Sequence, residues 1–267
     1  MPFSADVQNP PPPPPPGIQI VVPERTPVKA MKAILVFIVY MVTQVIAGAI
    51  ATIVYVIATG KDAAMVASSV EDMDPVLLLV AGTAGFVLGG PVVFALARAM
   101  ERGSTWKEAL APFGVVKASP RAIAAGVGLG VAIAVVLGFG LEMVFPSPEN
   151  AEGPLIQAAA APGWQRILFV LLAVLLAPVI EEFLFRGVMY TGMLRSWGKW
   201  PAGIVVTLSF GLLHLADVGG YWPALFMITV VGLGLLLVRI KTKSLIPAIA
   251  MHAAYNLFQV LALYFLS

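Results

Sequence analysis

Acidic, basic and imidazole side chains occur within three segments that are otherwise apolar enough to cross a membrane. The chain contains two histidines, His214 and His252, and each lies in such a segment; a third segment carries Glu181, Glu182 and Arg186. A charged residue at the centre of a membrane helix costs about 2.5 to 3.5 kcal/mol on insertion scales, so polar residues at this depth usually have a function. Carboxylates and imidazoles are the groups that proteins use as general acids and bases. Their presence in three spans therefore indicates a catalytic or transport centre inside the membrane.

The segment around the two glutamates reads Ala-Pro-Val-Ile-Glu-Glu-Phe-Leu-Phe-Arg-Gly from residue 177 onwards. Glu182 and Arg186 lie four residues apart, so on a helix they can form an ion pair on one face. Glu181 is turned by about 100° from Glu182, and we expect it to face the interior of the helix bundle. Pro178 removes a backbone hydrogen bond just before the glutamates and is expected to kink the helix, which would let water or substrate approach. By itself, the segment is equally consistent with an ion pair that only joins helices.

Two further segments place a second side chain one helical turn from a histidine. Phe210 precedes His214 by four residues, and Asn256 follows His252 by four. Each pair, by itself, is also typical of polar residues that pack between membrane helices. A helix rises about 1.5 Å per residue, so Glu181 and His214 each lie about 20 Å from the cytoplasmic end of their span. By the same count His252 lies about 12 Å from the cytoplasmic end of its span. Because polar faces at these depths need polar partners, we expect the three segments to contact one another.

The composition is that of a membrane protein with several spans. Hydrophobic residues make up 60% of the chain and charged residues 11%, which is far from the composition of soluble domains. A spanning helix needs about 20 mostly apolar residues. We therefore predict an all-α, polytopic transmembrane helical bundle of about seven to eight spans, with a further interfacial helix at 103–112 or 151–162. The seven clearest segments are 33–59, 76–98, 122–145, 167–193, 201–216, 221–239 and 244–266.

Glycines spaced four residues apart predict close packing of the second and third spans. The pairs are Gly85 with Gly89 and Gly126 with Gly130, a spacing that lets neighbouring membrane helices approach closely. Gly128 lies between the second pair, so this run also resembles a nucleotide-binding loop. Because the run lies within an unbroken apolar segment, we interpret it as a packing surface, and no nucleic-acid partner is expected. The chain has no cysteine, which excludes disulfides and thiolate metal sites.

The loop charges predict the orientation of the chain. Basic residues gather before the first predicted span and after the second, fourth and sixth, whereas the alternate loops are acidic or nearly uncharged. The positive-inside rule then places the N-terminus in the cytoplasm and the C-terminus outside, which supports an odd number of spans. We expect an integral multi-pass protein of a bacterial cell membrane. The basic loop residues are Arg25, Lys29, Lys32, Arg98, Arg102, Lys107, Lys117, Arg121, Arg195, Lys199, Arg239, Lys241 and Lys243.

The first 30 residues differ from the rest of the chain. They contain seven consecutive prolines, Pro10 to Pro16, which favour extended polyproline II structure. The run is interpreted either as a semi-rigid spacer in a disordered tail, which we favour, or as a ligand for a proline-binding domain. The tail lacks the apolar core of a signal peptide, so the first span is expected to serve as targeting signal and anchor. We divide the chain into a cytoplasmic proline-rich tail (1–30), N-terminal transmembrane helices (31–160) and a catalytic transmembrane domain (161–267).

Three motifs resemble those of the CPBP intramembrane proteases, a family that includes the CAAX prenyl endopeptidases and the bacterial Abi proteins linked to bacteriocin processing and immunity. The motifs are Glu-Glu-x-x-x-Arg at 181–186, Phe-x-x-x-His at 210–214 and His-x-x-x-Asn at 252–256. Each motif is short, but all three occur in the order of the family and within apolar helices. The resemblance covers roughly residues 165–262.

The resemblance implies a membrane-embedded endopeptidase that hydrolyses a peptide bond. By analogy with the family, Glu181 and His214 would activate a water molecule. His252 and Asn256 would stabilise the oxyanion, an interaction worth on the order of 3 to 4 kcal/mol at comparable protease sites. The supporting residues would be Glu182, Arg186 and Phe210.

A metal-dependent mechanism is a second interpretation of the same residues. Glu181, His214 and His252 could form a His₂Glu zinc site with one open position. The H-E-x-x-H spacing of many zinc proteases is absent. We favour a metal-free, glutamate-type mechanism without a cofactor.

Two functions of other classes use the same residues. A proton-coupled transporter would use Glu181, His214 and His252 as a relay, although the chain shows no pair of motif-bearing halves of the kind that many transporters have. A non-catalytic scaffold or immunity protein would keep only the fold. The expected partners are the lipid bilayer and a membrane-anchored protein or peptide substrate. Prenylated C-termini, bacteriocin leaders and membrane-anchored sorting tails all remain candidate substrates.

Overall fold

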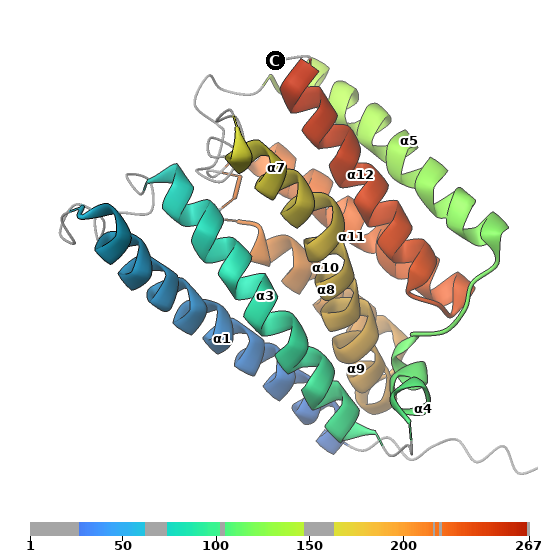
Figure 1. The fold of residues 1–267 in the computed structure, drawn as a ribbon. Helices are drawn as coiled ribbons and strands as arrows, with labels where there is room; N and C mark the ends of the chain where they lie inside the picture. The colour runs from blue at the N-terminus through green and yellow to red at the C-terminus, as the bar shows by residue number, and fades with distance from the viewer. Residues whose placement is uncertain are drawn as a thin grey trace, which may run out of the picture.

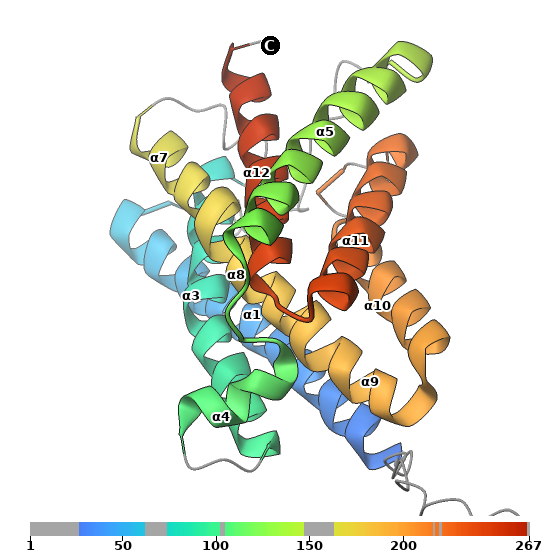
Figure 2. The same cartoon turned by 90° about the vertical axis from the view of Figure 1, so that its right-hand side faces the viewer.

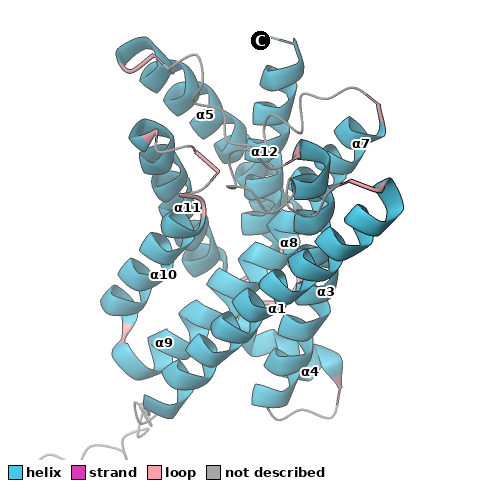
Figure 3. Ribbon diagram, turned by 90° about the vertical axis from the view of Figure 1, so that its left-hand side faces the viewer, coloured by secondary structure: helices cyan, strands magenta, loops and turns pink. Residues whose placement is uncertain are grey.

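The computed structural model describes residues 27–61, 74–101, 105–146, 163–215, 217–218 and 221–265, and every regular element among them is helical (Figure 3). Six helices in these ranges are long and apolar enough to cross a membrane, which confirms the predicted all-α polytopic bundle. The proline run Pro10–Pro16 and the alternative interfacial helix at 151–162 lie outside the described residues. The six long helices are α1 (Pro27–Thr59), α3 (Pro75–Met100), α5 (Pro120–Val144), the continuous helix Trp164–Trp197, α11 (Trp222–Thr242) and α12 (Ile246–Phe265).

The helix Trp164–Trp197 runs through the middle of the bundle, between the α1–α3 pair and the group of α5, α11 and α12 (Figures 1 and 2). It consists of α7 (Trp164–Val170), the π-helical segment η3 (Leu171–Leu176), α8 (Ala177–Glu182), the π-helical segment η4 (Phe183–Met189) and α9 (Tyr190–Trp197). π-Helical turns are rare and occur frequently at functional sites. The two glutamates therefore end a short α-helical stretch that has a π segment on either side.

The fifth predicted span is shorter in the structure than a membrane crossing requires. Helix α10 covers Lys199–Leu213, which is 15 residues, so it is about 22 Å long against a hydrocarbon thickness of about 30 Å. It packs against α9 and α11 and ends at His214. Non-helical backbone at membrane depth occurs only where it is buried in protein or lines a water-filled cavity. Because α10 ends early, the backbone at His214 lies at membrane depth without a following helical turn. It must therefore be buried in protein or contact water.

The predicted glycine pair of the third span lies at a very close helix contact. A Cβ atom at Gly126 would lie 2.4 Å from the carbonyl oxygen of Pro247, and one at Gly130 would lie 2.3 Å from that of Met251. Both oxygens belong to the backbone of α12, so no side-chain movement could relieve the overlap. Helix α5 thus packs directly on the backbone of the helix that carries His252.

Aromatic side chains join α1 and α3 to the central helix. Phe94 of α3 stacks on Phe183 with a ring separation of 4.0 Å, and Phe37 of α1 meets Phe185 edge-on at 6.0 Å. Phe183 and Phe185 directly follow the two glutamates in the sequence. Helices α1 and α3 therefore pack against the part of the central helix that comes just after Glu182. Facing outwards, α1 exposes large apolar side chains such as Val45 and Ile57, as expected for a surface in contact with lipid.

A short helix follows α3 at one end of the bundle, where the sequence predicts an interfacial helix at 103–112. Helix α4 (Trp106–Leu110) begins with a capping box between Thr105 and Glu108 and continues into the 3₁₀ turn η2 (Ala111–Phe113). Gly114 follows at a φ of 92°, a conformation that favours glycine. Its carbonyl accepts a hydrogen bond from the N–H of Leu245 at 2.9 Å, which ties the short helix to the start of α12.

At the other end of α3, Asp74 is the N-terminal cap, and we expect Asp74→Ala to destabilise the bundle. Its side chain accepts a hydrogen bond from the N–H of Val76 at 2.9 Å. It also forms an ion pair with Lys61 and accepts a hydrogen bond from the hydroxyl of Tyr55, near the end of α1. Burial acts to raise the pKa of Asp74, but these hydrogen bonds outweigh it and lower the pKa to about 2 from an ordinary value of 3.8. Loss of an N-cap costs about 1 kcal/mol.

Because the folded-state pKa is lowered, the contribution of Asp74 is fully present above about pH 4. It should be lost as the pH falls towards 2, and Asp74→Ala should remove this part of the acid sensitivity. Asp74→Asn is the matched control, since asparagine caps a helix equally well but carries no charge. Thermal denaturation of the detergent-solubilised protein between pH 2 and pH 7 measures both effects. Equal stability of the alanine and asparagine variants at pH 7 would contradict the capping role.

Candidate active site

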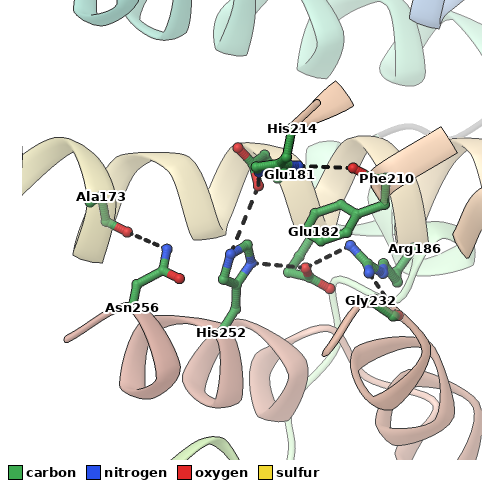
Figure 4. Close-up of polar contacts among 9 residues, drawn as sticks. All are labelled: Ala173, Glu181, Glu182, Arg186, Phe210, His214, Gly232, His252 and Asn256. Atoms are coloured by element: carbon green, nitrogen blue, oxygen red, sulfur yellow. Dashed lines mark hydrogen bonds and ion pairs between the residues drawn. The ribbon is translucent and has the colours of Figure 1, made fainter. Parts of the chain in front are cut away.

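The candidate site lies at the middle of the longest membrane helix. Glu181 is the eighteenth residue of the 34-residue helix Trp164–Trp197, so it lies about 24 to 26 Å from either end. Glu181 is 5% exposed and Glu182 is fully buried. Helices α8, α10 and α12 bring their motif residues together here (Figure 4). Three short motifs that are far apart in sequence thus converge within the bundle.

Glu182 and Arg186 form the ion pair that their spacing predicts. Nη1 of Arg186 donates to Oε1 of Glu182 at 2.9 Å, and both side chains are fully buried. Nη2 of Arg186 also donates to the carbonyl oxygen of Gly232 on α11 at 2.8 Å. The guanidinium lies 4.2 Å from the ring centre of Phe210, within the range of a cation–π contact. The pair therefore joins the central helix to both α10 and α11.

His252 lies between the two carboxylates (Figure 4). Its Nδ1 lies 3.1 Å from Oε1 of Glu182, and its Nε2 lies 3.8 Å from Oε2 of Glu181. A ring nitrogen that faces a carboxylate must carry a proton to make a hydrogen bond, which assigns Nδ1–H as the donor to Glu182. Glu182 thus orients His252, and the opposite ring nitrogen of His252 is directed at Glu181.

His214 reaches Glu181 from the end of α10. Its Nδ1 lies 2.8 Å from the carbonyl oxygen of Phe210, and its Nε2 lies 4.0 Å from Oε2 of Glu181. A carbonyl oxygen is only an acceptor, so Nδ1 carries the proton and the neutral ring presents an unprotonated Nε2 to Glu181. Phe210 therefore supports the site twice, through its carbonyl on His214 and through its ring on Arg186.

Oε2 of Glu181 is the point at which the two histidines meet. It is buried and accepts no hydrogen bond from the part of the chain that the structure describes. Its separations of 3.8 and 4.0 Å from the two Nε2 atoms are too long for direct hydrogen bonds. They are somewhat shorter than the roughly 4.5 Å between two atoms that share one bridging water molecule, which makes two hydrogen bonds of about 2.8 Å. A carboxylate oxygen and two imidazole nitrogens, which belong to groups that can act as general bases, thus lie close together inside the bundle.

Asn256 is placed differently from the other motif residues. Its Nδ2 donates to the carbonyl oxygen of Ala173 at 2.8 Å and not to Glu181. In segment η3 the N–H of Ala177 donates to the carbonyl of Leu172, five residues back. In the same pattern the carbonyl of Ala173 would accept from residue 178, which is a proline without an N–H. Asn256 of α12 thus supplies the hydrogen bond that Pro178 cannot.

We expect Asn256→Ala to destabilise the protein, because the carbonyl oxygen of Ala173 would lose the hydrogen bond from Nδ2 of Asn256. A buried carbonyl that loses its only donor costs about 1 to 3 kcal/mol. In a Pro178→Ala background the same substitution should cost less, because the alanine restores a backbone N–H to the helix. Thermal denaturation of the wild type, both single variants and the double variant measures this coupling. An identical loss on removing Asn256 in both backgrounds would contradict it.

Two residues near Glu181 lie outside the sequence motifs. Tyr40 of α1 is 2% exposed, is hydrogen-bonded to Gln44 and lies within electrostatic reach of Glu181. A Cβ atom at Gly89 would lie 2.8 Å from the Tyr40 ring, so the predicted small-residue surface of α3 makes room for this side chain. In the sequence, the pattern that could have identified Tyr40 is its spacing of one helical turn from Gln44 within an apolar span.

The second such residue is Asp217, in the turn after α10. Its N–H donates to the carbonyl oxygen of His214 at 3.1 Å. Its carboxyl group is largely buried and lies within electrostatic reach of both His214 and Glu181. An acidic residue three positions after the motif histidine was the signal that could have identified it. Asp217 adds a third carboxyl group to the electrostatic surroundings of Glu181 and His214.

The residues considered for a zinc site are spaced more widely in this arrangement than the ligands of a bound zinc ion. Tetrahedral zinc with bonds of about 2.0 to 2.1 Å places its ligand atoms about 3.3 Å apart, and Oε2 of Glu181 lies 3.8 and 4.0 Å from the histidine nitrogens. Across the described ranges, no group of three or more histidine, aspartate or glutamate side chains is arranged to hold a metal ion.

Fold and site together define a polytopic helical membrane protein with a buried carboxylate–histidine centre. Residues 162–258 match the model of the family described as type II CAAX prenyl endopeptidase Rce1-like. This match confirms the resemblance to the CAAX protease family, and it includes all seven motif residues. Helices α1, α3 and α5 lie outside the matched region. No curated protein and no solved structure gives a significant match to the chain.

Proposed function

We propose that the protein is an intramembrane endopeptidase that hydrolyses a peptide bond near the membrane-anchored end of a protein or peptide substrate. The observation that carries this proposal is the convergence of two imidazole nitrogens on Oε2 of Glu181, inside helices long enough to span a bilayer. The family match over residues 162–258 supports the reaction class.

In the proposed mechanism, Glu181 and His214 activate a water molecule held between them. As the water oxygen bonds to the substrate carbonyl carbon, its proton passes to the Glu181 carboxylate. A tetrahedral intermediate with a negatively charged oxygen results. Collapse of this intermediate breaks the carbon–nitrogen bond, and the proton is delivered to the leaving amine. Carboxylate and imidazole general bases contribute about 10²- to 10⁴-fold each to such reactions.

His252 and Asn256 are proposed to stabilise the oxyanion. Glu182 accepts from Nδ1 of His252 and so favours a ring that can bind a proton at Nε2 and donate it towards the substrate. Asn256 uses one amide hydrogen for Ala173, and its second remains a donor. Arg186 balances the charge of Glu182 and positions Phe210. The oxyanion of the tetrahedral intermediate would therefore accept hydrogen bonds from His252 and Asn256 of α12.

The membrane location restricts the substrate to a peptide that can enter the bundle. Helix α10 ends at His214, so the backbone beyond it offers polar groups at membrane depth. A substrate segment that is extended rather than helical could satisfy those groups while its anchor stays in lipid. Prenylated C-termini, bacteriocin leaders and membrane-anchored sorting tails are the candidate substrates.

Comparison of membrane proteomes tests the proposal and identifies the substrate. Membranes containing the wild type should show new C-termini or trimmed precursors that are missing from membranes containing His214→Ala at equal abundance. A scaffold or immunity protein would give the same C-termini and the same phenotype with both proteins. That result would contradict the proposed function.

Removal of metal ions is expected to leave the cleavage activity unchanged. Since no step of the proposed mechanism passes through a metal, dialysis against a strong chelator should preserve the rate on a substrate found in the proteome comparison. The metal content of the purified protein, measured in parallel, provides the control. Loss of activity that one equivalent of zinc restores would show that Glu181 and the histidines act as metal ligands.

A further inference from the structure

A cavity of about 250 Å³ lies between α1, α3 and α9, at the end of the bundle where α1 begins. Lys29 and Lys32 of α1 line it together with Arg195 of α9 and Glu101 after α3, and Met100 and Phe113 supply apolar walls. We call it the basic cavity. Arg195 lies 14 residues beyond Glu181 on the same helix, about 21 Å along its axis, so the basic cavity is separate from the candidate active site.

Positive charge exceeds negative charge among the described residues that line the basic cavity. Arg195 is ion-paired with Glu101, so one cation is balanced. Lys29 and Lys32 lie three residues apart on the same face of α1, are exposed, and make no ion pair within the described ranges. Two positive charges therefore remain for an anionic ligand. The volume is far above the roughly 10 to 15 Å³ that a cavity needs to hold one water molecule.

The basic cavity lies at the level where a membrane meets water. Trp106 of α4, Trp197 of α9 and Trp200 of α10 are exposed at 56%, 38% and 76%, and all three belong to helix ends at this end of the bundle (Figures 1 and 2). Exposed tryptophans of this kind mark the headgroup region of a bilayer. An amphiphilic ligand could place an anionic group in the cavity while its chains remain beside the apolar outer face of α1.

The helix contacts around the cavity keep its shape fixed. A Cβ atom at Gly192 would lie 2.9 Å from the carbonyl oxygen of Lys29, so α9 and α1 touch directly. The N–H of Ala30 also donates to the hydroxyl of Ser196 at 3.0 Å. The lysines therefore project from a backbone that is anchored on the central helix, and they do not need to be ordered by a loop.

We propose that the basic cavity binds a phosphate-bearing anion, most simply the headgroup of an anionic phospholipid. Basic pockets between membrane helices are suited to such headgroups, and each lysine near an anionic surface contributes about 1 kcal/mol. Bound lipid would bridge α1 and α9. Its binding would stabilise the packing of the first helix on the central helix, independently of any cleavage reaction.

Thermal denaturation of the full-length protein in a neutral detergent tests this proposal. Short-chain phosphatidylglycerol should raise the melting temperature of the wild type, and phosphatidylcholine of the same chain length should not. Lys29→Gln/Lys32→Gln should bind phosphatidylglycerol on the order of thirty-fold more weakly, which corresponds to about 2 kcal/mol for two lysines. Lys199→Gln/Lys241→Gln is the matched control, because it removes two exposed lysines outside the cavity and should respond like the wild type.

Inorganic phosphate, added without anionic lipid, identifies the source of the anion. A shift with phosphate that the Lys29→Gln/Lys32→Gln variant loses would support the phosphate site with a soluble ligand. A shift with phosphatidylglycerol alone would support the lipid headgroup. If the Lys29→Gln/Lys32→Gln variant responded to both probes as the wild type does, or if the wild type responded to neither, the proposal would be wrong.

Discussion

Replacement of Glu181 by glutamine is expected to slow peptide-bond cleavage by about 10²- to 10⁴-fold, the contribution of a general base. Glutamine has nearly the same shape as glutamate but cannot take a proton from water. Oε2 of Glu181 accepts no hydrogen bond from the described residues, so the substitution should leave the fold intact. The rate on a substrate from the proteome comparison, together with the melting temperature, measures both consequences.

Glu142→Gln is the matched control for this experiment. Glu142 lies near the end of α5 on an exposed face, so its loss removes a carboxylate from a membrane helix outside the site. Of the two variants, only Glu181→Gln should be slow. A Glu181→Gln protein that cleaves within a few-fold of the wild-type rate would show that Glu181 is not the base.

Arg186→Leu is expected to be the most destabilising single substitution at the site. It leaves the carboxylate of Glu182 buried without its cation and removes the donor to the carbonyl of Gly232. Breaking a buried ion pair from one side costs about 3 to 5 kcal/mol. Denaturant unfolding in mixed micelles measures the difference in the free energy of unfolding.

The ion pair of Arg195 with Glu101 provides the comparison on the same helix. These two side chains are 28% and 23% exposed, and an ion pair at such a partly exposed position contributes about 0 to 1 kcal/mol. Arg195→Leu should therefore be nearly neutral. The double variant Glu182→Gln/Arg186→Leu should recover part of the loss, because no unpaired charge remains. Equal effects of Arg186→Leu and Arg195→Leu would contradict the structural role of the buried pair.

The architecture was largely predictable because membrane helices are encoded locally. Apolar length alone locates the six long helices. The orientation of the chain, which rests on the alternation of charge between loops, stays a prediction. Spacing also predicts that Glu182 pairs with Arg186, since four residues make one turn. The depth argument predicts that Glu181, His214 and His252 lie close together, and in the structure Nε2 of each histidine lies within 4.0 Å of Oε2 of Glu181.

Features that depend on contacts between distant segments could not be predicted in the same way. The sequence indicates that Pro178 disturbs the helix, but not that π-helical turns flank the glutamates or that Asn256 satisfies Ala173. Helix α10 ends before it crosses a full bilayer, although its apolar run extends to residue 216. Tyr40 and Asp217 belong to no motif, and only the packing of α1 and of the turn after α10 brings them near Glu181.

Cleavage rates of Glu181→Gln, His214→Gln and the double variant test most directly whether these two residues act on one water molecule. Residues that act as a unit have non-additive effects on rate. The double variant should therefore be about as slow as the slower single variant. Rate losses that multiply, or a single variant that keeps the wild-type rate, would contradict the shared-water site.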